Sequence, residues 1–317
     1  MGDGQVCDAV TDTANAIAQM EIRGAVAIAD ATAAALRDQA TQSSAADAAT
    51  LQAELRAAAR RLHDTRPTAV SLPNTLRYVL NSMDGDTVEA VRTAVVSAVA
   101  EFRDRLDRAQ TDLGAVGASR LSTGDTVMTH CHSTDVLACI VTAVNQGTEL
   151  SAIVKETRPR KQGHMTARRL DELGVPVTFI VDSAAHSYLD ETDHVFVGAD
   201  TITADGSVVN KIGTAGLAAS ARERGVDVVV AAQTLKLDPE TLSGGRVDIE
   251  HRDVGEVLSG ELSQEFDSVD VANPAFDRTP ARHVDAIVTE RGQFPPESIV
   301  MLMRELYGPE PGRPWEA

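Results

Sequence analysis

Three residues that could move protons, Cys131, Asp200 and Lys211, each stand just after a strand-like run or just before a helix-like run of this chain. Cys131 follows the apolar run that ends at Met128 and precedes an amphipathic run that begins at Val136. A thiol beside the amino terminus of a helix lies where backbone N–H groups and the helix dipole favour a thiolate. A thiolate, a carboxylate and an ammonium group together predict a pocket for proton transfer on a phosphorylated substrate.

The length of 317 residues and the hydrophobic content of 43% predict a soluble protein with a full core and two domains. We expect a helical N-terminal domain over residues 1–117 and a catalytic domain over residues 118–317. No apolar stretch approaches the roughly 20 residues that a membrane span needs, and the N terminus does not resemble a signal peptide. The sequence therefore predicts a cytoplasmic protein that does not enter a membrane.

The three cysteines, Cys7, Cys131 and Cys139, have no spacing typical of a metal site and cannot all pair with one another. We therefore expect reduced thiols, no zinc site and no disulfide framework. The chemistry sketched above needs neither a metal nor a redox cofactor. The interpretation of Cys139 is packing, because it lies on an apolar stripe of the predicted helix.

The net charge of −18 argues against broad affinity for nucleic acid or for anionic membranes. It also favours adaptation to a salty cytosol, because at molar salt the Debye length falls to about 3 Å and the carboxylates repel one another only weakly. Arginine supplies most of the basic residues, so each lysine that remains is a candidate for an anion site, with a solvated surface position as the alternative for any one of them. There are four: Lys155, Lys161, Lys211 and Lys236.

The first 115 or so residues have apolar residues at helical spacing and show no strand-like alternation. One such series begins at Leu51, and another begins at Val88. At the start of the second series, Asp86 and Glu89 have the spacing of a capping box. The alanine-rich tract 25–40 is interpreted as a tightly packed helix, with a flexible linker as the weaker alternative.

The rest of the chain alternates short β-branched runs with helical patterns, which predicts a Rossmann-like, mostly parallel, doubly wound sheet of the α/β class. The predicted strands are 127–129, 150–154, 175–181, 195–197, 226–231 and 286–288. The predicted helices are 135–146, 164–173, 184–189, 212–224 and 296–307. Ligands of such sheets bind at the carboxyl ends of the strands, where Cys131, Asp182, Asp200 and Thr234 fall. The acidic region 238–270 is predicted to be an irregular insertion, and no glycine-rich dinucleotide or Walker motif is present.

Several motifs along nearly the whole chain resemble one superfamily, which joins archaeal ribose-1,5-bisphosphate isomerases, methylthioribose-1-phosphate isomerases and the regulatory subunits of translation initiation factor 2B. They are Ile22-Arg23-Gly24-Ala25, the segment from Arg66 to Asn74, Thr129-His130-Cys131-His132-Ser133, Glu156-Thr157-Arg158-Pro159, Gly163, Gly198-Ala199-Asp200, the segment from Asn210 to Thr214 and the segment from Asn273 to Asp277. The pair Cys131 and Asp200 resembles the isomerases, because the initiation factor subunits lack it. The Cys-His-Ser and Ser-Leu-Pro-Asn sequences resemble the ribose-bisphosphate branch.

The resemblance implies that Cys131 takes the C2 proton of an aldose 1-phosphate, through a cis-enolate, while Asp200 donates and shuttles protons between the oxygens. It also implies a set of substrate-binding residues drawn from both domains, which would close the site between them. These are Arg23, Gly24, Ala25, Arg66, Ser133, Thr134, Asp135, Asn210, Lys211 and Lys236.

Some of these residues have alternative interpretations. Ribose-bisphosphate isomerases tend to carry a basic residue after His-Ser, and this chain has Thr134 and Asp135 there. Asp135 would repel a phosphate unless it points away as the helix N-cap. Arg23 and Arg66 could be helix-end surface charges. His132 is expected to support the site from behind, and Asp182 and Arg158 either shape the pocket or form an interdomain ion pair.

The function that the resemblance implies is conversion of α-D-ribose 1,5-bisphosphate into D-ribulose 1,5-bisphosphate in nucleotide and ribose salvage. A methylthioribose-1-phosphate isomerase and a non-catalytic regulatory subunit are the alternatives. The resemblance also implies a homo-oligomer, a dimer or a hexamer, and a possible response to AMP.

Overall fold

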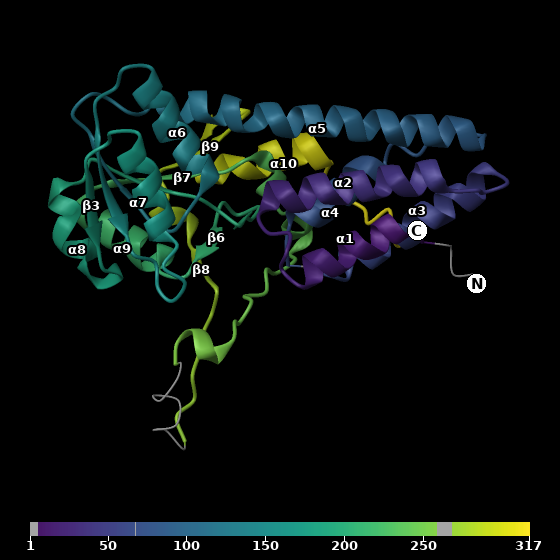
Figure 1. The fold of residues 1–317 in the computed structure, drawn as a ribbon. Helices are drawn as coiled ribbons and strands as arrows, with labels where there is room; N and C mark the ends of the chain where they lie inside the picture. The colour runs from purple at the N-terminus through teal and green to yellow at the C-terminus, as the bar shows by residue number, and fades with distance from the viewer. Residues whose placement is uncertain (1–5, 67, 259–267) are drawn as a thin grey trace. The chain divides into compact units, whose positions relative to one another are not determined.

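The computed structural model describes residues 6–66, 68–258 and 268–317 (Figure 1). The chain divides into two compact units. The first comprises Met1–Ala109 and Glu310–Ala317, and the second comprises Gln110–Pro309. Each unit is described by itself below.

The first unit is helical, and the sequence predicted this from the apolar spacing. Its helices are α1 (Asp8–Ala18), α2 (Ala25–Gln42), α3 (Ala48–His63), α4 (Ser71–Leu80) and the first part of α5 (Val88–Ala118). The alanine-rich tract forms α2, and the small side chains of Ala29 and Ala33 are fully buried. The capping box at Asp86 was wrong: α5 begins at Val88, and the hydroxyl oxygen of Thr87 accepts the Ala90 N–H at 3.2 Å.

The second unit is built on a seven-stranded sheet in the order β10-β9-β7-β4-β1-β2-β3. All neighbouring strands are parallel except the pair β9 and β10. The strands are β1 (Thr126–Thr129), β2 (Ser151–Lys155), β3 (Val177–Ile180), β4 (His194–Val197), β7 (Asp227–Ala231), β9 (Ala286–Thr289) and β10 (Gly292–Phe294). The six predicted strands are therefore confirmed, and β10 is an addition.

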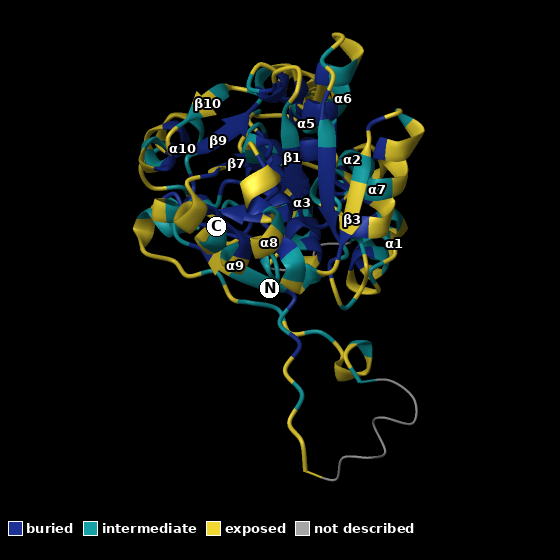
Figure 2. Cartoon of the chain, turned by 90° about the vertical axis from the view of Figure 1, so that its left-hand side faces the viewer, coloured by how far each residue is buried: buried dark blue, intermediate teal, exposed yellow. Residues whose placement is uncertain are grey.

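Helices cover both faces of this sheet, as the predicted doubly wound fold requires. They are α6 (Thr134–Asn145), α7 (Gly163–Glu172), α8 (Ala185–Tyr188), α9 (Thr214–Arg224) and α10 (Ile299–Tyr307). Because successive strand side chains point to opposite faces, Val127 packs in one core cluster with α6 and the end of α5, while Met128 packs in the other with α9 and α10. The central strands are buried on both faces (Figure 2).

A small antiparallel sheet in the order β5-β6-β8 was not predicted. It consists of β5 (Thr201–Ile202), β6 (Val208–Lys211) and β8 (Phe276–Thr279). β6 pairs with β8 although α9, β7 and the acidic insertion lie between them in the chain. Of that insertion, residues 259–267 lie outside the described part, and an isolated bridge joins His251 to Pro274.

Two glycines, Gly114 and Gly117, lie near the end of α5, which continues to Ala118. A Cβ atom at Gly117 would lie 2.1 Å from the sulfur of Cys139, and one at Gly114 would lie 2.9 Å from the hydroxyl of Thr142. These glycines therefore allow α5 to approach α6 closely, which is a packing role and not a break in the helix.

The order of the strands defines one switch point. The chain runs from β1 outward through β2 and β3 on one side, and through β4, β7 and β9 on the other. In a doubly wound sheet, ligands bind beside the carboxyl ends of the two strands at which this order reverses. Here those strands are β1, which Cys131 follows, and β4, which Asp200 follows.

Candidate active site

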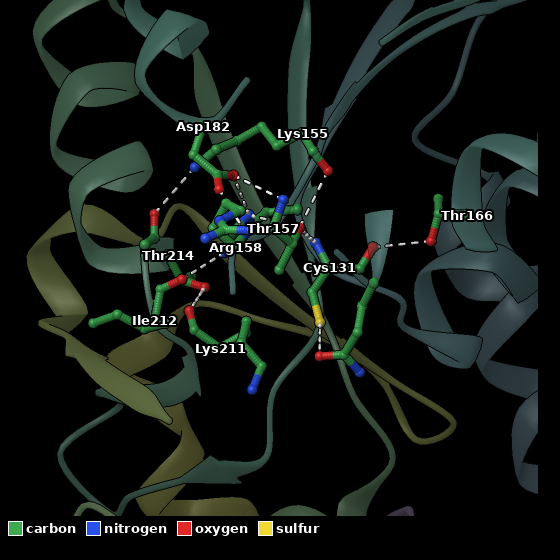
Figure 3. A network of polar contacts seen from close by, with 12 residues as sticks. Cys131, Lys155, Thr157, Arg158, Thr166, Asp182, Lys211, Ile212 and Thr214 are labelled. Carbon is green, nitrogen blue, oxygen red and sulfur yellow. Dashed lines mark hydrogen bonds and ion pairs between the residues drawn. The ribbon is translucent and has the colours of Figure 1, made fainter. Parts of the chain in front are cut away.

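Cys131 lies on a tightly held turn after β1 and is 9% exposed. Its backbone has a φ of 73°, in the left-handed region. Its N–H donates to the hydroxyl of Thr157 at 2.8 Å, and its carbonyl accepts from the hydroxyl of Thr166 at 2.9 Å. The thiol donates to the side-chain carbonyl of Gln162 at 3.5 Å (Figure 3).

Burial raises the pKa of the Cys131 thiol to about 11. The positive charge of Lys211 acts in the opposite direction, whereas the carboxylate of Asp200 adds to the increase. The expectation of a thiolate favoured by the helix terminus was therefore wrong for the free protein, because desolvation outweighs the favourable charges. The amino terminus of α6 is also capped by Ser133, whose hydroxyl accepts the Val136 N–H at 3.3 Å.

Lys211 and Asp200 form the rest of the predicted proton-transfer group. Burial lowers the pKa of Lys211, and the negative charges of Cys131 and Asp200 oppose this. The Lys211 ammonium lies 4.9 Å from the centre of the Phe276 ring, and in Figure 3 it points toward the same side of the network as the sulfur of Cys131. Asp200 is exposed, and its backbone N–H donates to Val209 at 2.9 Å. The structure thus brings the three groups within electrostatic reach of one another.

Two glycines make room for this arrangement. A Cβ at Gly198 would lie 2.5 Å from the Ser133 hydroxyl, so the end of β4 can approach the loop after Cys131 only without a side chain there. Gly213 has a φ of 99° and lies beside His130, which lets β6 turn directly into α9.

Asp135 is not the helix N-cap, the position in which it would have pointed away from a phosphate. Ser133 is the N-cap, Thr134 is the first residue of α6, and the Asp135 side chain is buried. Its carboxylate binds the ammonium of Lys236 at 2.7 Å and accepts from the side-chain amide of Gln233 at 3.1 Å. Lys236 therefore already has an anionic partner in this structure.

Asn210 is buried, and its amide donates to the hydroxyl of Thr214 at 3.0 Å. This contact holds the turn that carries Lys211. His132 contacts the hydroxyl of Thr166 at 3.0 Å, and burial lowers the pKa of its ring. It therefore supports the Cys131 loop from behind, as expected.

Four residues of the first unit, Arg23, Gly24, Ala25 and Arg66, were predicted to bind substrate. Arg23 and Gly24 are exposed just before α2, where Gly24 is the N-cap with a φ of 88°. Arg66 is half-buried in the turn after α3. Their part in the site stays a prediction.

A buried polar network, which was not predicted from the sequence, lies next to Cys131. The side chains of Lys155, His130 and Thr157 are each at most 3% exposed. The Asp182 carboxylate accepts the N–H of Thr157 at 2.9 Å and that of Arg158 at 2.7 Å. The sequence could have indicated this network at Lys155, because a charged residue at the end of an apolar strand needs polar partners when it is buried.

A hollow opens beside this network. It is lined by polar and charged residues of the loop after β2, of β6 and of the insertion: Thr157, Arg158, Arg160, Gln162, Lys211, Arg252, Glu256 and Asn273. Arg160 pairs with Glu256, and Arg252 lies 3.2 Å from Glu250. Lys211 and Arg158 are the other two cations that line the hollow. Among the described residues, no carboxylate lies within ion-pair distance of either one.

Of the other two lysines, Lys161 is exposed and lies 3.5 Å from Glu156, so the surface alternative holds for it. Lys155 donates to the carbonyl of Gly213 at 3.4 Å. Within the described ranges, no group of three or more His, Cys, Asp or Glu side chains is arranged to hold a metal ion. None of the helices there is long and apolar enough to cross a membrane.

This combination of a doubly wound sheet and a strand-end cysteine belongs to a known class. Residues 21–296 match the model of the initiation factor 2 subunit family, and the chain belongs to that family. Over 99% of its length it is 64% identical to the ribose 1,5-bisphosphate isomerase of Haloferax volcanii, of which it covers 97%.

Two solved structures have the same fold over nearly the whole chain. The Pyrococcus horikoshii protein described as translation initiation factor eIF-2B is 29% identical, with a TM-score of 0.78, and the match covers 93% of this chain and 99% of that one. The 5-methylthioribose 1-phosphate isomerase of the same organism is 31% identical, with a TM-score of 0.75, and the match covers 94% and 88%.

Proposed function

We propose that this protein converts ribose 1,5-bisphosphate into ribulose 1,5-bisphosphate. The observation that carries the proposal is the meeting of Cys131, Asp200 and Lys211 at the switch point of the sheet, in a chain that is 64% identical to an isomerase of that name. A thiol, a carboxylate and a cation are the groups that an aldose–ketose conversion without redox chemistry requires.

The reaction moves protons and leaves the overall oxidation state unchanged. The bond between C1 and the ring oxygen breaks, and Asp200 supplies the proton that the ring oxygen gains. Cys131, as the thiolate, removes the proton from C2, which gives a cis-enolate between C1 and C2. The C2 hydroxyl then gives its proton to the Asp200 carboxylate and becomes the ketone, while the Cys131 thiol gives the proton that it took from C2 to C1, so that both groups return to their starting protonation states.

The electrostatics of the site assign Lys211 two roles in this scheme. Because burial raises the pKa of Cys131, the thiolate needs a nearby positive charge, and Lys211 is the cation that acts on it. The same ammonium faces a hollow that also contains Arg158, which suits a phosphate group of the substrate. Lys236, which is paired with Asp135, can contribute only if it shares its ammonium between that carboxylate and the substrate.

The test is turnover by the purified chain. Ribose 1,5-bisphosphate, ribose 1-phosphate and methylthioribose 1-phosphate are supplied separately, and the ketose product is identified by NMR. We expect a strong preference for the bisphosphate. A preference for methylthioribose 1-phosphate would assign the chain to the other isomerase branch, and turnover of none of the three would favour a regulatory subunit.

We further propose that the protein acts in the cytoplasm as a homo-oligomer, a dimer or a hexamer, in nucleotide and ribose salvage, and responds to AMP. The family resemblance supports these points. Sedimentation velocity tests the oligomer, and the isomerase assay with and without AMP tests the response.

A further inference from the structure

We propose that Asp182 is a positioning residue for the Cys131 thiol and acts through Thr157. The inference rests on the proposed function, because it assigns to Asp182 a part in placing the reacting sulfur. Asp182 itself follows β3, two strands away from β1 in the sheet, and its negative charge also contributes to the raised pKa of the Cys131 thiol.

The backbone of the site has unfavourable conformations that other residues must hold in place. Both Cys131 and Thr157 adopt the left-handed region, with φ values of 73° and 66°. This region is unfavourable for residues with a Cβ, and especially for a β-branched residue such as threonine. Such conformations persist when the surrounding contacts fix them, and they concentrate at functional sites.

The Asp182 carboxylate supplies those contacts at Thr157. One oxygen accepts the Thr157 N–H at 2.9 Å, and the other accepts the Arg158 N–H at 2.7 Å. Both oxygens are therefore used to hold two successive peptide groups, which fixes the turn after β2 against the end of β3. In Figure 3, Asp182 lies above Thr157 and Arg158, with Cys131 beyond Thr157.

Thr157 passes this constraint on to Cys131. Its hydroxyl accepts the Cys131 N–H at 2.8 Å, and the hydroxyl of Thr166 donates to the Cys131 carbonyl at 2.9 Å. The two peptide groups that flank the Cys131 Cα are thus pinned by threonine hydroxyls. The direction of the thiol depends on both, and only the Thr157 contact leads to Asp182.

His130 fixes the orientation of the Thr157 hydroxyl. Its Nε2 lies 2.8 Å from the carbonyl of Ile212, which can only accept, so in the neutral ring Nε2 carries the proton and Nδ1 is an acceptor. Burial holds the pKa of His130 at about 4, so the ring is neutral near pH 7. The Thr157 hydroxyl can therefore donate to Nδ1 at 3.3 Å or to the Lys155 carbonyl at 3.1 Å, and it keeps a lone pair for the Cys131 N–H.

The charges around Asp182 suit a fixed carboxylate. Lys155 is buried, and burial lowers its pKa. The negative charges of Asp182 and then Asp277 oppose this lowering. His130 Nδ1 lies 3.8 Å from Asp182, and it carries no charge near neutral pH. Asp277 faces Lys155 as well, and it accepts the backbone N–H groups of Gly213 and Ala215.

The experiment uses the full chain with the substitution Cys7→Ser as background and has two readouts. One is steady-state turnover of ribose 1,5-bisphosphate. The other is the rate at which iodoacetamide alkylates Cys131 at pH 8, followed by mass spectrometry, which needs no substrate. The variants are Asp182→Asn, Thr157→Val and Thr157→Ser. The matched control is Asp193→Asn, since Asp193 also accepts a backbone N–H, that of Thr126 at 2.8 Å, but at the amino end of the sheet.

We expect Asp182→Asn to lower kcat by about 100-fold, to change KM by less than about threefold, and to raise the alkylation rate about tenfold, because the loosened turn exposes the thiol and the lost carboxylate charge lowers its pKa. Thr157→Val keeps that charge, so a faster alkylation in this variant reports the loosened turn alone. Asp193→Asn should change neither readout. Thr157→Val should behave like Asp182→Asn, and Thr157→Ser, which keeps the hydroxyl, should lose much less.

The inference is overturned if Asp182→Asn keeps wild-type kcat, or if it loses kcat while Cys131 is alkylated as in wild type. An equal loss in Asp193→Asn also overturns it. If Asp182→Asn does not fold, as judged by circular dichroism, the difference between Thr157→Val and Thr157→Ser decides. If the wild type turns over none of the sugar phosphates, the proposed function fails, and the alkylation rates still decide whether Asp182 positions the thiol.

Discussion

Cys131 and Cys139 lie eight residues apart, and both are buried, but their surroundings differ. Burial raises the pKa of the first to about 11 and that of the second to about 12. Cys139 lies within α6, donates to the Asp135 carbonyl at 3.2 Å and packs against Gly117. Cys131 has a left-handed backbone, an amide partner in Gln162 and a nearby ammonium in Lys211.

The difference teaches that a raised thiol pKa does not identify a reactive cysteine. What distinguishes Cys131 is the strained backbone, held by hydrogen bonds from the loop after β2 and from α7, and the cation that can favour the thiolate. Around Cys139 the helices α5 and α6 pack closely, and the thiol contacts the backbone carbonyls of Asp135 at 3.2 Å and Leu113 at 3.9 Å. The four predictions below test this comparison.

The largest effect is expected from removing each sulfur in turn. Cys131→Ser should lower kcat by about 10²- to 10⁴-fold, because a hydroxyl is too weak a base to take the C2 proton. Cys139→Ser should change kcat by less than about twofold, since its hydroxyl can still donate to the Asp135 carbonyl. Steady-state kinetics on both variants measure this, and near-native turnover by Cys131→Ser would show that another group is the base.

The second prediction concerns the pH dependence of thiol reactivity. Because the pKa of Cys131 is raised, its alkylation at pH 7.5 should be about 100-fold slower than that of a free thiol of pKa about 8.5. The rate should increase about tenfold per pH unit from pH 7 to 10, while Cys139 stays unmodified in the folded protein. Stopped time courses with mass spectrometry measure both, and a plateau for Cys131 below about pH 9 would contradict the raised pKa.

The third prediction separates the cation at the thiol from a surface cation. Lys211→Met should raise KM for ribose 1,5-bisphosphate by about 10- to 100-fold, which corresponds to the roughly 1.5–3 kcal/mol of a charge-assisted contact. It should also slow alkylation of Cys131 further. Lys161→Met is the matched control, because Lys161 is exposed, and it should change KM by less than about twofold. Equal effects in both variants would remove Lys211 from the site.

The smallest effect is expected at the packing site. Gly117→Ala places a Cβ against the Cys139 sulfur and should lower the free energy of unfolding by about 1–3 kcal/mol without changing kcat. Combining it with Cys139→Ala should recover part of that loss, because alanine removes the sulfur at 2.1 Å but keeps the Cβ, which would lie 2.8 Å from the new atom. Urea unfolding of the two single variants and the double variant measures the coupling. Strictly additive losses would mean that the two residues do not interact.

Much of the fold could be predicted from the sequence. The six parallel strands were predicted because each is a short β-branched run between turn residues, and a strand buried on both faces needs such a run. The strand-end rule then predicted that Cys131 and Asp200 lie at one edge. The small sheet was not predicted, since β5 has two residues and β6 pairs with β8 across the insertion.

The family that the motifs resembled was confirmed by the comparisons, whereas details of individual side chains were less predictable. The sequence could not show that Asp135 binds Lys236, because 101 residues separate them. It also predicted a thiolate from the nearby helix terminus, and burial proved the larger influence on Cys131. Both errors arise because the partner of Asp135 and the burial of Cys131 are set by segments that lie far apart in the sequence.

The sequence by itself determined the alternation of strands and helices, the strand ends that carry Cys131, Asp200 and Lys211, and the family, because these depend on local patterns along the chain. The tertiary structure alone decided the left-handed turns at Cys131 and Thr157 and the position of the Asp182 carboxylate, which accepts the N–H groups of Thr157 and Arg158. The physical reason is that each of these needs hydrogen bonds between strand ends that come together only when the sheet forms.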